Sequence, residues 1–371
     1  MSPAMPPTQL PSFFGSPVRR LAACCVTLCA IVLMTVRTAA AEPPQPATPI
    51  PVKVVVVTMF ENGKMTGDKP GEAQFWVERQ KLDHVMPFPL GEYELRTNDA
   101  GLLLICTGGG ITNATSSIMA LGLDPRFDLS KAYWLVAGIG GGDPLDVSLG
   151  TAAWAKHVVD GDLLYEIDAR EIPADWPYGL LPLGAKKPND RASGWTVDTI
   201  HYALNPALAD WAYALTKDHP VADSPGIAAF RRQFAGYPNA IRPPFVTLGD
   251  SLSSSKYWHG ERMNQWANDW MKLQAGPAAN FMMTNMEDSG TLTALRRLSR
   301  VGRVDLQRVM VLRTASNYTM PPPGKNAAWS TTAEYPESGV PALEAAYQVG
   351  NRVVQELLSG WSRYRDTPPG I

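Results

Sequence analysis

The sequence is poor in cysteine and histidine and has no marked excess of charge of either sign. Its 371 residues include 4 cysteines and 5 histidines, and 33 basic against 35 acidic side chains give a formal net charge of −2. Because no long basic run is present to follow a phosphate backbone, nucleic acid is not expected as a partner. The histidines lack an H-x-x-x-H or similar spacing, so we predict no metal site, and we expect no cofactor.

Three of the cysteines lie in the apolar run LAACCVTLCAIVLMTV, which follows two arginines and precedes small residues. This pattern, with Ala41 at an A-x-A-like site, predicts a secretory signal over residues 1–41 and hence a periplasmic or secreted protein. Leu21 to Cys24 also have the letters of a bacterial lipobox, but the apolar segment follows this cysteine instead of preceding it. Cleavage near Ala41 would leave Cys106 without an intramolecular disulfide partner, and we expect it to be a small buried side chain.

Strand and helix patterns alternate through the rest of the chain. A proline-rich linker over residues 42–51 leads to a globular part over 52–358, and a tail covers 359–371. Buried strands are predicted in the apolar segments VKVVVVTMF, GLLLICTGGG, AYWLVAGIGGG, PPFVTLGDS and RVMVLRTASNYT. Residues 165–240 change to loops and short amphipathic helices, which is typical of an insertion. We therefore predict an α/β fold, a mixed central sheet flanked by helices with a helical insertion.

Three consecutive glycines in TGGGITNATSSIMAL, residues 107–121, separate a strand from a helical pattern. Glycine allows a positive φ and a helix N-terminus attracts anions, so this geometry permits a phosphate without requiring one. No Walker A sequence is present, and a Rossmann fingerprint fails because Asn113 stands where a glycine or alanine belongs. The sequence TNMEDSG places Glu287 at another strand-to-helix junction, where it either favours the helix dipole or binds a ligand.

Five ordered motifs, TGGGITNA, AGIGGGDPLDVSLGTAAWAKHVVDGD, TLGDS, NMEDSG and LRTASNYT, resemble the nucleoside phosphorylase and nucleosidase superfamily, and within it the purine nucleoside permeases. The resemblance covers residues 52–358 and implies a nucleoside phosphorylase-like fold that binds purine nucleosides. It implies that Glu287 holds the ribose hydroxyls, that Met286 lies against the sugar or base, and that Asn317 contacts purine N7. An amide can bind N7 and stabilise a leaving purine, but it is no general acid of ordinary strength.

The resemblance assigns further substrate contacts to the two glycine clusters and to the segment beside the base. These residues are Gly109, Gly110, Gly138, Gly141, Gly249 and Asp250. For the last two, a structural turn is the alternative. Phosphorolytic relatives combine such glycines with an arginine near the second cluster, but residues 135–137 hold none, which weakens the case for phosphate as the nucleophile. Arg96, Arg242 or an arginine of another subunit could take the place of the missing arginine.

Hydrolytic relatives instead place a glutamate after the first strand to activate water. Glu61 in VVVVTMFENG is near that position, and the alternative is a solvated loop residue. Two functions follow from the resemblance. One is an exported purine nucleoside-binding protein linked to uptake across a membrane. The other is an enzyme that cleaves the N-glycosidic bond, with Glu61 and Asn317 as catalytic residues. Two partners are compatible with this resemblance: a transporter component in the membrane and a second copy of the chain.

Overall fold

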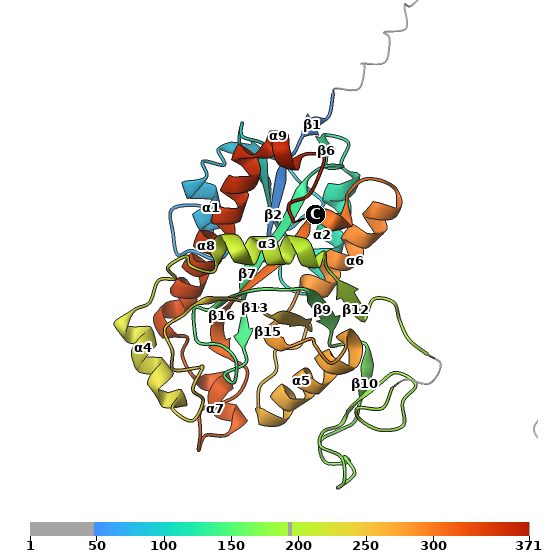
Figure 1. Ribbon diagram of the computed structural model, residues 1–371, viewed down its shortest axis with the longest axis vertical. Helices are drawn as coiled ribbons and strands as arrows, with labels where there is room; N and C mark the ends of the chain where they lie inside the picture. The colour runs from blue at the N-terminus through green and yellow to red at the C-terminus, as the bar shows by residue number, and fades with distance from the viewer. Residues whose placement is uncertain (1–47, 192–194, 371) are drawn as a thin grey trace, which may run out of the picture. The chain divides into compact units, whose positions relative to one another are not determined.

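Figure 1 shows the computed structural model of the chain, which describes residues 48–191 and 195–370. The segment predicted as a signal, residues 1–41, lies outside the described residues, as does most of the predicted linker. Among the described helices, none combines the length and the apolar character needed to cross a membrane.

Twelve strands of the described chain form one mixed sheet, and most neighbours near its centre are parallel. The order along the sheet is β12 (His201–Ala203), β9 (His157–Asp160), β14 (Asp250–Ser253), β15 (Phe281–Asn285), β7 (Tyr133–Gly142), β2 (Val54–Thr58), β5 (Leu102–Cys106), β4 (Leu95–Thr97) and β3 (His84–Met86). A branch is formed by β16 (Val309–Tyr318), which pairs with β7 and with β8 (Ala152–Trp154), and by β13 (Val246–Leu248), which pairs with β8.

The central strands are apolar on both faces because helices cover both faces. In β2, Val55 and Val57 belong to one buried cluster and Val54 and Val56 to another, as the alternation of side chains along a strand requires. Continuous burial of this kind is the expected environment of central parallel strands, and it explains the uninterrupted valine run.

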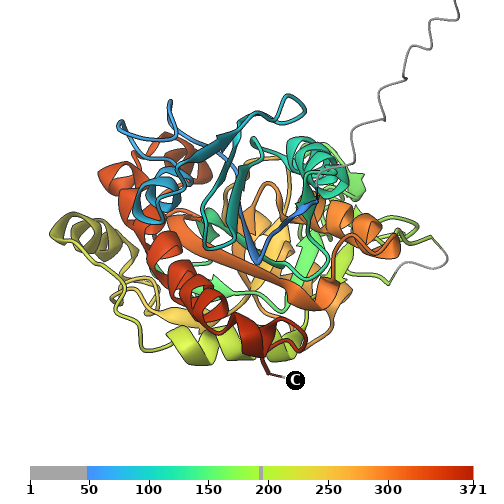
Figure 2. The same cartoon turned by 90° about the horizontal axis from the view of Figure 1, so that it is seen from above.

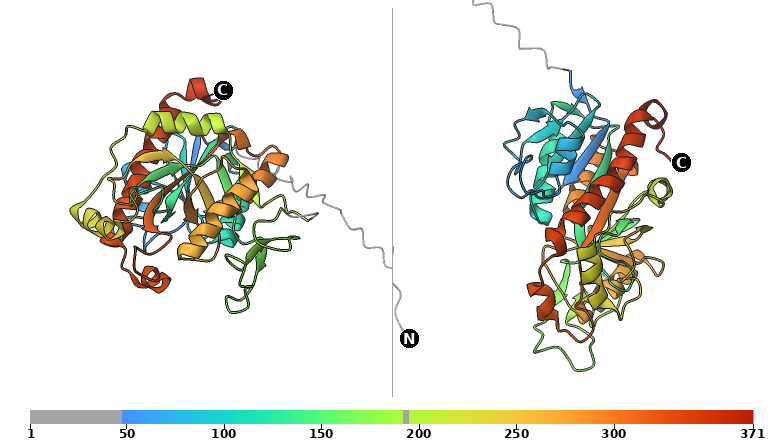
Figure 3. Two further views of the ribbon diagram at one scale, coloured as in Figure 1. Left: turned by 60° about the horizontal axis from the view of Figure 1, so that its bottom comes forward. Right: turned by 90° about the vertical axis from the view of Figure 1, so that its left-hand side faces the viewer.

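Helices α2 (Ile111–Leu123) and α6 (Asp288–Arg300) cover one face of the sheet. The other face is covered by α1 (Gln74–Arg79), α3 (Pro206–Thr216) and α8 (Val340–Ser359). Figure 2 shows α8 on one side of the central strands and α2 on the other, and Figure 3 shows α8 crossing in front of β2. The predicted α/β fold, a mixed sheet flanked by helices, is confirmed.

Three segments have more ordered structure than their composition suggests. Ile50–Pro51, at the end of the predicted linker, forms β1 and pairs with β6 (Phe127–Asp128). Within residues 165–240, β12 joins the edge of the central sheet and α3 packs against α8. In the tail, the backbone oxygen of Tyr364 accepts hydrogen bonds from the Tyr133 hydroxyl at 2.7 Å and from Arg308 Nη1 at 3.0 Å.

The remaining elements are short, apart from one long helix beside the sheet. They are β10 (Leu164–Glu166), β11 (Leu180–Pro182), α4 (Pro225–Arg231), α5 (Glu261–Ala275), α7 (Ala327–Thr332), α9 (Trp361–Tyr364), and the 3₁₀ helices η1 (Arg232–Phe234), η2 (Leu306–Arg308) and η3 (Pro336–Gly339).

Candidate functional site

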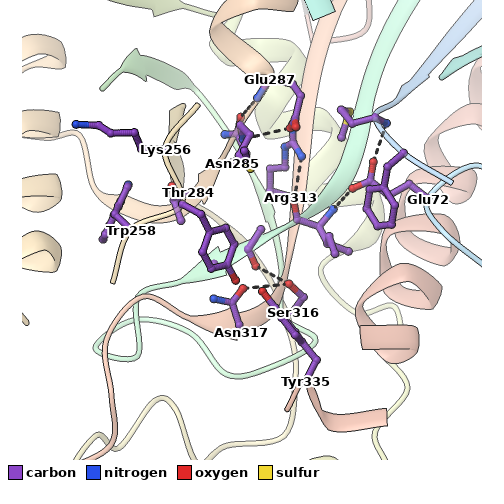
Figure 4. Close-up of a pocket in the computed structure, with 17 residues that line it drawn as sticks. Glu72, Lys256, Trp258, Thr284, Asn285, Glu287, Arg313, Ser316, Asn317 and Tyr335 are labelled. Carbon is purple, nitrogen blue, oxygen red and sulfur yellow. Dashed lines mark hydrogen bonds and ion pairs between the residues drawn. The ribbon is translucent and has the colours of Figure 1, made fainter. Parts of the chain in front are cut away.

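A cavity of about 190 Å³ lies where β7, β15 and β16 meet the loop that follows β2. Its polar side chains are Glu72, Lys256, Thr284, Asn285, Glu287, Arg313, Ser316 and Asn317. Its aromatic side chains are Phe60, Tyr257, Trp258 and Tyr335. Figure 4 shows Arg313 at the centre, with Glu287 on one side, Ser316 and Asn317 on the opposite side, and Glu72 and Trp258 far apart across the view. Apolar walls with a few convergent polar groups are typical of a small-molecule site.

Arg313 is a fully buried cation held by carboxylates. Its Nε and Nη2 donate to Asp288 Oδ1 at 3.1 Å and 2.5 Å, and Nη2 also lies 3.3 Å from Glu287 Oε2. Its Nη1 donates to the backbone oxygen of Ile139 at 3.0 Å. Burial alone would lower the pKa of Arg313, but Asp288, Glu287 and Glu72 together raise it. The guanidinium therefore stays charged and is already neutralised by the protein.

Glu287 stands at the predicted strand-to-helix junction and also lines the cavity. Its carboxylate accepts hydrogen bonds from the backbone N–H of Gly110 at 3.2 Å and of Met286 at 3.1 Å. Asn285 Oδ1 accepts from the N–H groups of Glu287 and Asp288 at 3.0 Å and 2.8 Å, which fixes the start of α6. Burial raises the pKa of Glu287, while Arg313 opposes the shift.

Glu72 is the acidic residue that sequence reasoning missed. Its Oε1 accepts from the N–H of Ile139 at 2.7 Å and its Oε2 from the N–H of Met59 at 2.8 Å, so the side chain ties the loop after β2 to β7. Burial raises the pKa of Glu72 to about 8, with Arg313 lowering it and Glu287 raising it further. A buried carboxyl with a raised pKa in a cavity is a candidate for proton transfer.

Glu61 does not have the position predicted for a water-activating residue. It is not among the side chains that line the cavity. Its carboxylate accepts from the N–H groups of Asn62 at 2.9 Å, Ala73 at 3.1 Å and Gln74 at 2.7 Å, and also from Gly71. The bonds from Ala73 and Gln74 satisfy free amides at the start of α1, and those from Asn62 and Gly71 hold the loop before it. We correct the prediction accordingly: the carboxyl that follows β2 and reaches the cavity is Glu72.

The glycines predicted to bind substrate have different tasks. Gly141 lines the cavity. Gly110 is the residue that precedes α2 and has φ 91°. It donates its N–H to the Glu287 carboxylate, which lines the cavity. A Cβ on Gly138 would meet Met59 Cε, Glu72 Oε1 and Arg313 Nη1 within 2.8 Å, whereas a Cβ on Gly109 would meet nothing within 4 Å. The second glycine cluster lies inside β7 and forms no turn.

Gly249 and Asp250 do not line the cavity. Asp250 is buried and accepts from the backbone N–H groups of Lys156 at 3.1 Å, His157 at 2.8 Å and Asn280 at 2.9 Å. The carboxylate therefore joins β14 to two neighbouring segments. Asp250 begins this strand and does not lie in a turn.

Arg96 and Arg242, the two candidates to replace the missing arginine, do not line the cavity. Arg96 pairs with Glu94 at 2.7 Å, and the guanidinium carbon of Arg242 lies 4.4 Å from the ring centre of Phe245. The cavity arginine is Arg313, whose register partner on the adjacent strand β7 is Gly138. One charged residue in an otherwise apolar strand was the signal that could have identified it.

Asn317 and Ser316 form the end of the cavity opposite Glu287. Asn317 Oδ1 accepts from Ser316 Oγ at 3.2 Å, and its Nδ2 donates to the backbone oxygen of Tyr318 at 3.2 Å. Because a primary amide has two N–H donors, one remains for a ligand. Met286 also lines the cavity. Of the predicted residues, the structure thus brings Gly141, Met286, Glu287 and Asn317 together.

The family model described as purine nucleoside permease matches residues 51–369. The chain belongs to this family. A purine nucleoside permease of Candida albicans is 33% identical over 272 residues, which are 72% of this chain and 66% of that protein. The chain therefore spans slightly less than two thirds of that relative. A protein of Schizosaccharomyces pombe named a probable purine nucleoside permease is 30% identical over 263 residues, 69% of this chain and 75% of that protein.

Solved structures similar to this permease-family chain have low sequence identity to it. A 5′-methylthioadenosine/S-adenosylhomocysteine nucleosidase of Neisseria meningitidis, in complex with methylthio-immucillin-A, is 15% identical, with a TM-score of 0.48 over 82% of this chain and 99% of that one. The nucleosidase of Campylobacter jejuni with the same name is 14% identical, with a TM-score of 0.48 over 83% and 99%. The predicted membership of the permease family is confirmed by the family match and by the relatives.

Proposed function

We propose that the cavity binds a purine nucleoside, with the ribose hydroxyls at Glu287 and purine N7 at Asn317. A carboxylate can accept hydrogen bonds from two hydroxyls, and the free N–H of Asn317 can donate to N7. The observation that carries the proposal is that these two side chains, from separate elements, line one cavity with aromatic side chains suited to a base. The relatives named purine nucleoside permeases support the same class of ligand.

Uptake across a membrane is the role we infer for this binding. The family and its named relatives support a link to transport. We propose that a signal over residues 1–41 exports the chain, which then delivers nucleoside to a membrane component. Mass spectrometry of the exported protein should find an N-terminus near Glu42. Recovery of the uncut N-terminus in the membrane pellet would contradict export.

Phosphate is a poor ligand for this cavity. Arg313 is already paired with Asp288 and lies within 3.3 Å of Glu287, so its charge is neutralised before any anion enters. Lys256, the other cation of the cavity wall, is paired with Glu166. An added phosphate would therefore meet the carboxylates beside Arg313 without a free cation in the described wall to balance it, which is unfavourable in a buried site. Water is therefore the nucleophile that the cavity favours if a reaction takes place there.

Hydrolysis of the N-glycosidic bond is the second candidate function, and Glu72 is the observation that favours it. In this reaction a water oxygen bonds to ribose C1′ while the bond from C1′ to purine N9 breaks. The electron pair leaves with the purine, and the proton of the water passes to Glu72. Asn317 stabilises the leaving purine at N7. Since burial raises the pKa of Glu72 to about 8, a rate that needs its ionised form rises with pH through that value.

Calorimetry with adenosine, inosine and guanosine tests binding, and assays for free base and ribose with and without phosphate test cleavage. Binding without product supports the carrier. Ribose release that is insensitive to phosphate supports hydrolysis, and Glu72→Gln should then lower the rate by about 10²-fold or more. Glu61→Gln should retain the rate, because Glu61 does not line the cavity. Ribose 1-phosphate as the main product would contradict the choice of water, and binding of no nucleoside would overturn the proposal.

A further inference from the structure

Two buried serines of β14 face the start of α6. Ser251, the last residue of the motif TLGDS, and Ser253 are alternate residues of this strand, so their side chains lie on the same face of the sheet. Ser251 Oγ donates to Asp288 Oδ2 at 2.9 Å, and Ser253 Oγ accepts from the N–H of Ser289 at 3.1 Å. Neither serine lines the cavity. Any effect that they have on a ligand therefore passes through other residues.

The hydroxyl of Ser251 is held in one orientation by its neighbours. Asn285 Nδ2 donates to Ser251 Oγ at 2.6 Å, while Asn285 Oδ1 accepts from the N–H groups that begin α6. An amide nitrogen is a donor and cannot accept, so the single proton of the hydroxyl is directed to the Asp288 carboxylate. Each polar atom in this arrangement thus has a partner, and the hydrogen bond from Ser251 to Asp288 has one direction.

This hydrogen bond influences how two buried acids share Arg313. Asp288 accepts from Nε and Nη2 of the guanidinium through Oδ1, while Ser251 holds its other oxygen, Oδ2. A partner at each oxygen fixes the plane of the Asp288 carboxylate. Glu287 is left with one contact of 3.3 Å to Arg313 Nη2 (Figure 4). Because a carboxylate in a close pair with a guanidinium has fewer lone pairs for a ligand, the position of Asp288 keeps Glu287 available.

We infer that Ser251 is a positioning residue that keeps Glu287 available to the ribose hydroxyls. The inference rests on the proposed function and assigns the selectivity for nucleosides with 2′- and 3′-hydroxyls in part to Ser251. Without the Ser251 hydroxyl, Asp288 Oδ2 loses its partner and the carboxylate is free to turn away from Arg313. Arg313 then moves closer to Glu287 and competes with the ribose hydroxyls for it. Nucleosides without these hydroxyls are insensitive to this competition.

Calorimetry with inosine and with 2′,3′-dideoxyinosine, which lacks both hydroxyls, tests the inference. The unmodified protein should bind inosine more tightly by about tenfold or more, the scale of a hydrogen bond to a charged group. Ser251→Ala should lower this ratio by about fivefold, the scale of one ordinary hydrogen bond, and leave the affinity for 2′,3′-dideoxyinosine within about twofold. Ser251→Cys keeps a weaker donor and should give an intermediate ratio.

Ser253→Ala is the matched control for Ser251→Ala. Ser253 is also buried and holds the same helix start, but its partner there is the backbone N–H of Ser289, which has no contact with Arg313. Chemical denaturation should show that both alanine variants lower the free energy of unfolding. Ser253→Ala should nevertheless keep the affinity ratio of the unmodified protein, because the pairing of Asp288 with Arg313 is unchanged.

An unchanged ratio in Ser251→Ala and Ser251→Cys would overturn the inference and leave the proposed function in place. Equal weakening of both nucleosides by Ser251→Ala, or an equal fall of the ratio in Ser253→Ala, would give Ser251 a structural role alone and overturn the inference as well. An unmodified protein that binds both nucleosides equally would contradict the role proposed for Glu287. One that binds neither nucleoside would overturn the proposed function, and the inference with it.

Discussion

Glu287 and Asp288 are adjacent acids that both contact Arg313, yet their surroundings give them different tasks. Asp288 is fully buried, accepts from Ser251 Oγ at 2.9 Å, and holds two nitrogens of the guanidinium. Glu287 lines the cavity and makes one long contact with Arg313 at 3.3 Å. The first residue therefore stabilises the fold, and the second is available to a ligand.

Substitution of each acid by its amide separates these tasks. Glu287→Gln should weaken nucleoside binding by about 2–3 kcal/mol, because a charge-assisted acceptor is lost, while Asp288 keeps Arg313 neutralised. Asp288→Asn should instead lower the free energy of unfolding by about 3 kcal/mol, since it leaves a buried cation poorly paired. Calorimetry and chemical denaturation measure the two effects. The interpretation is wrong if Glu287→Gln binds as the unmodified protein does.

Glu61 and Glu72 form a second pair of acids with separate tasks. Glu61→Gln should lower the free energy of unfolding by about 1–3 kcal/mol, because an amide nitrogen cannot accept the N–H bonds that the carboxylate holds at α1. Its nucleoside affinity should stay within twofold of the unmodified protein. A large loss of affinity in Glu61→Gln, measured by calorimetry on folded protein, would show that Glu61 takes part in nucleoside binding.

At the scale of elements, β7 brings the site together because its glycines let neighbours approach its backbone. Gly138 leaves space for Met59, Glu72 and Arg313, and the backbone oxygen of Thr284 lies 2.2 Å from where a Cβ on Gly140 would stand. These glycines pair with β16, and the register of this pairing shifts between Ala315, opposite Gly140, and Asn317, opposite Gly141. They are needed for close contact between the strand and the atoms that pack against it.

An alanine scan of two glycines tests this view of β7. Gly138→Ala should displace Glu72 or Arg313, lower the free energy of unfolding by about 1–3 kcal/mol through overpacking, and weaken nucleoside binding. Gly109→Ala is the matched control, because its Cβ would meet no atom within 4 Å. Denaturation curves and calorimetry compare the two variants. Equal effects of both substitutions would contradict the role assigned to Gly138.

At the scale of the whole molecule, the proton on Glu72 links stability to pH. Burial raises its pKa from the ordinary value of 4.5 to about 8 in the folded protein. The folded state therefore holds a proton that the unfolded chain has lost. The stabilisation is complete below pH 4.5 and disappears as the pH rises through about 8.

The free energy of unfolding of the unmodified protein should therefore fall relative to that of Glu72→Gln as the pH rises. Between pH 5 and 8 we expect a change of about 1 kcal/mol per pH unit, the linkage of one proton. Denaturation at several pH values measures the difference, and a constant offset from the lost backbone hydrogen bond does not affect its slope. Parallel pH profiles of the two proteins would place the pKa of Glu72 near its ordinary value.

The elements of the fold and two ends of the site could be predicted from local sequence. Valine and leucine runs identify strands because burial on both faces demands continuous apolar residues. The glycines before Ile111 mark a helix start because Gly110 adopts a positive φ. Glu287 and Asn317 were identified through the resemblance of their motifs to a known family, and each stands at a defined place in its own element.

What the sequence by itself determined is therefore the set of local elements and their junctions. Only the tertiary structure decided which side chains share the cavity. Strand register sets Arg313 opposite Gly138, and the path of the loop after β2 brings Glu72 to Ile139 while Glu61 turns to α1. The physical reason is that spacing along the chain controls which face of an element a residue occupies, whereas contact across elements depends on register and loop path, which no local pattern specifies.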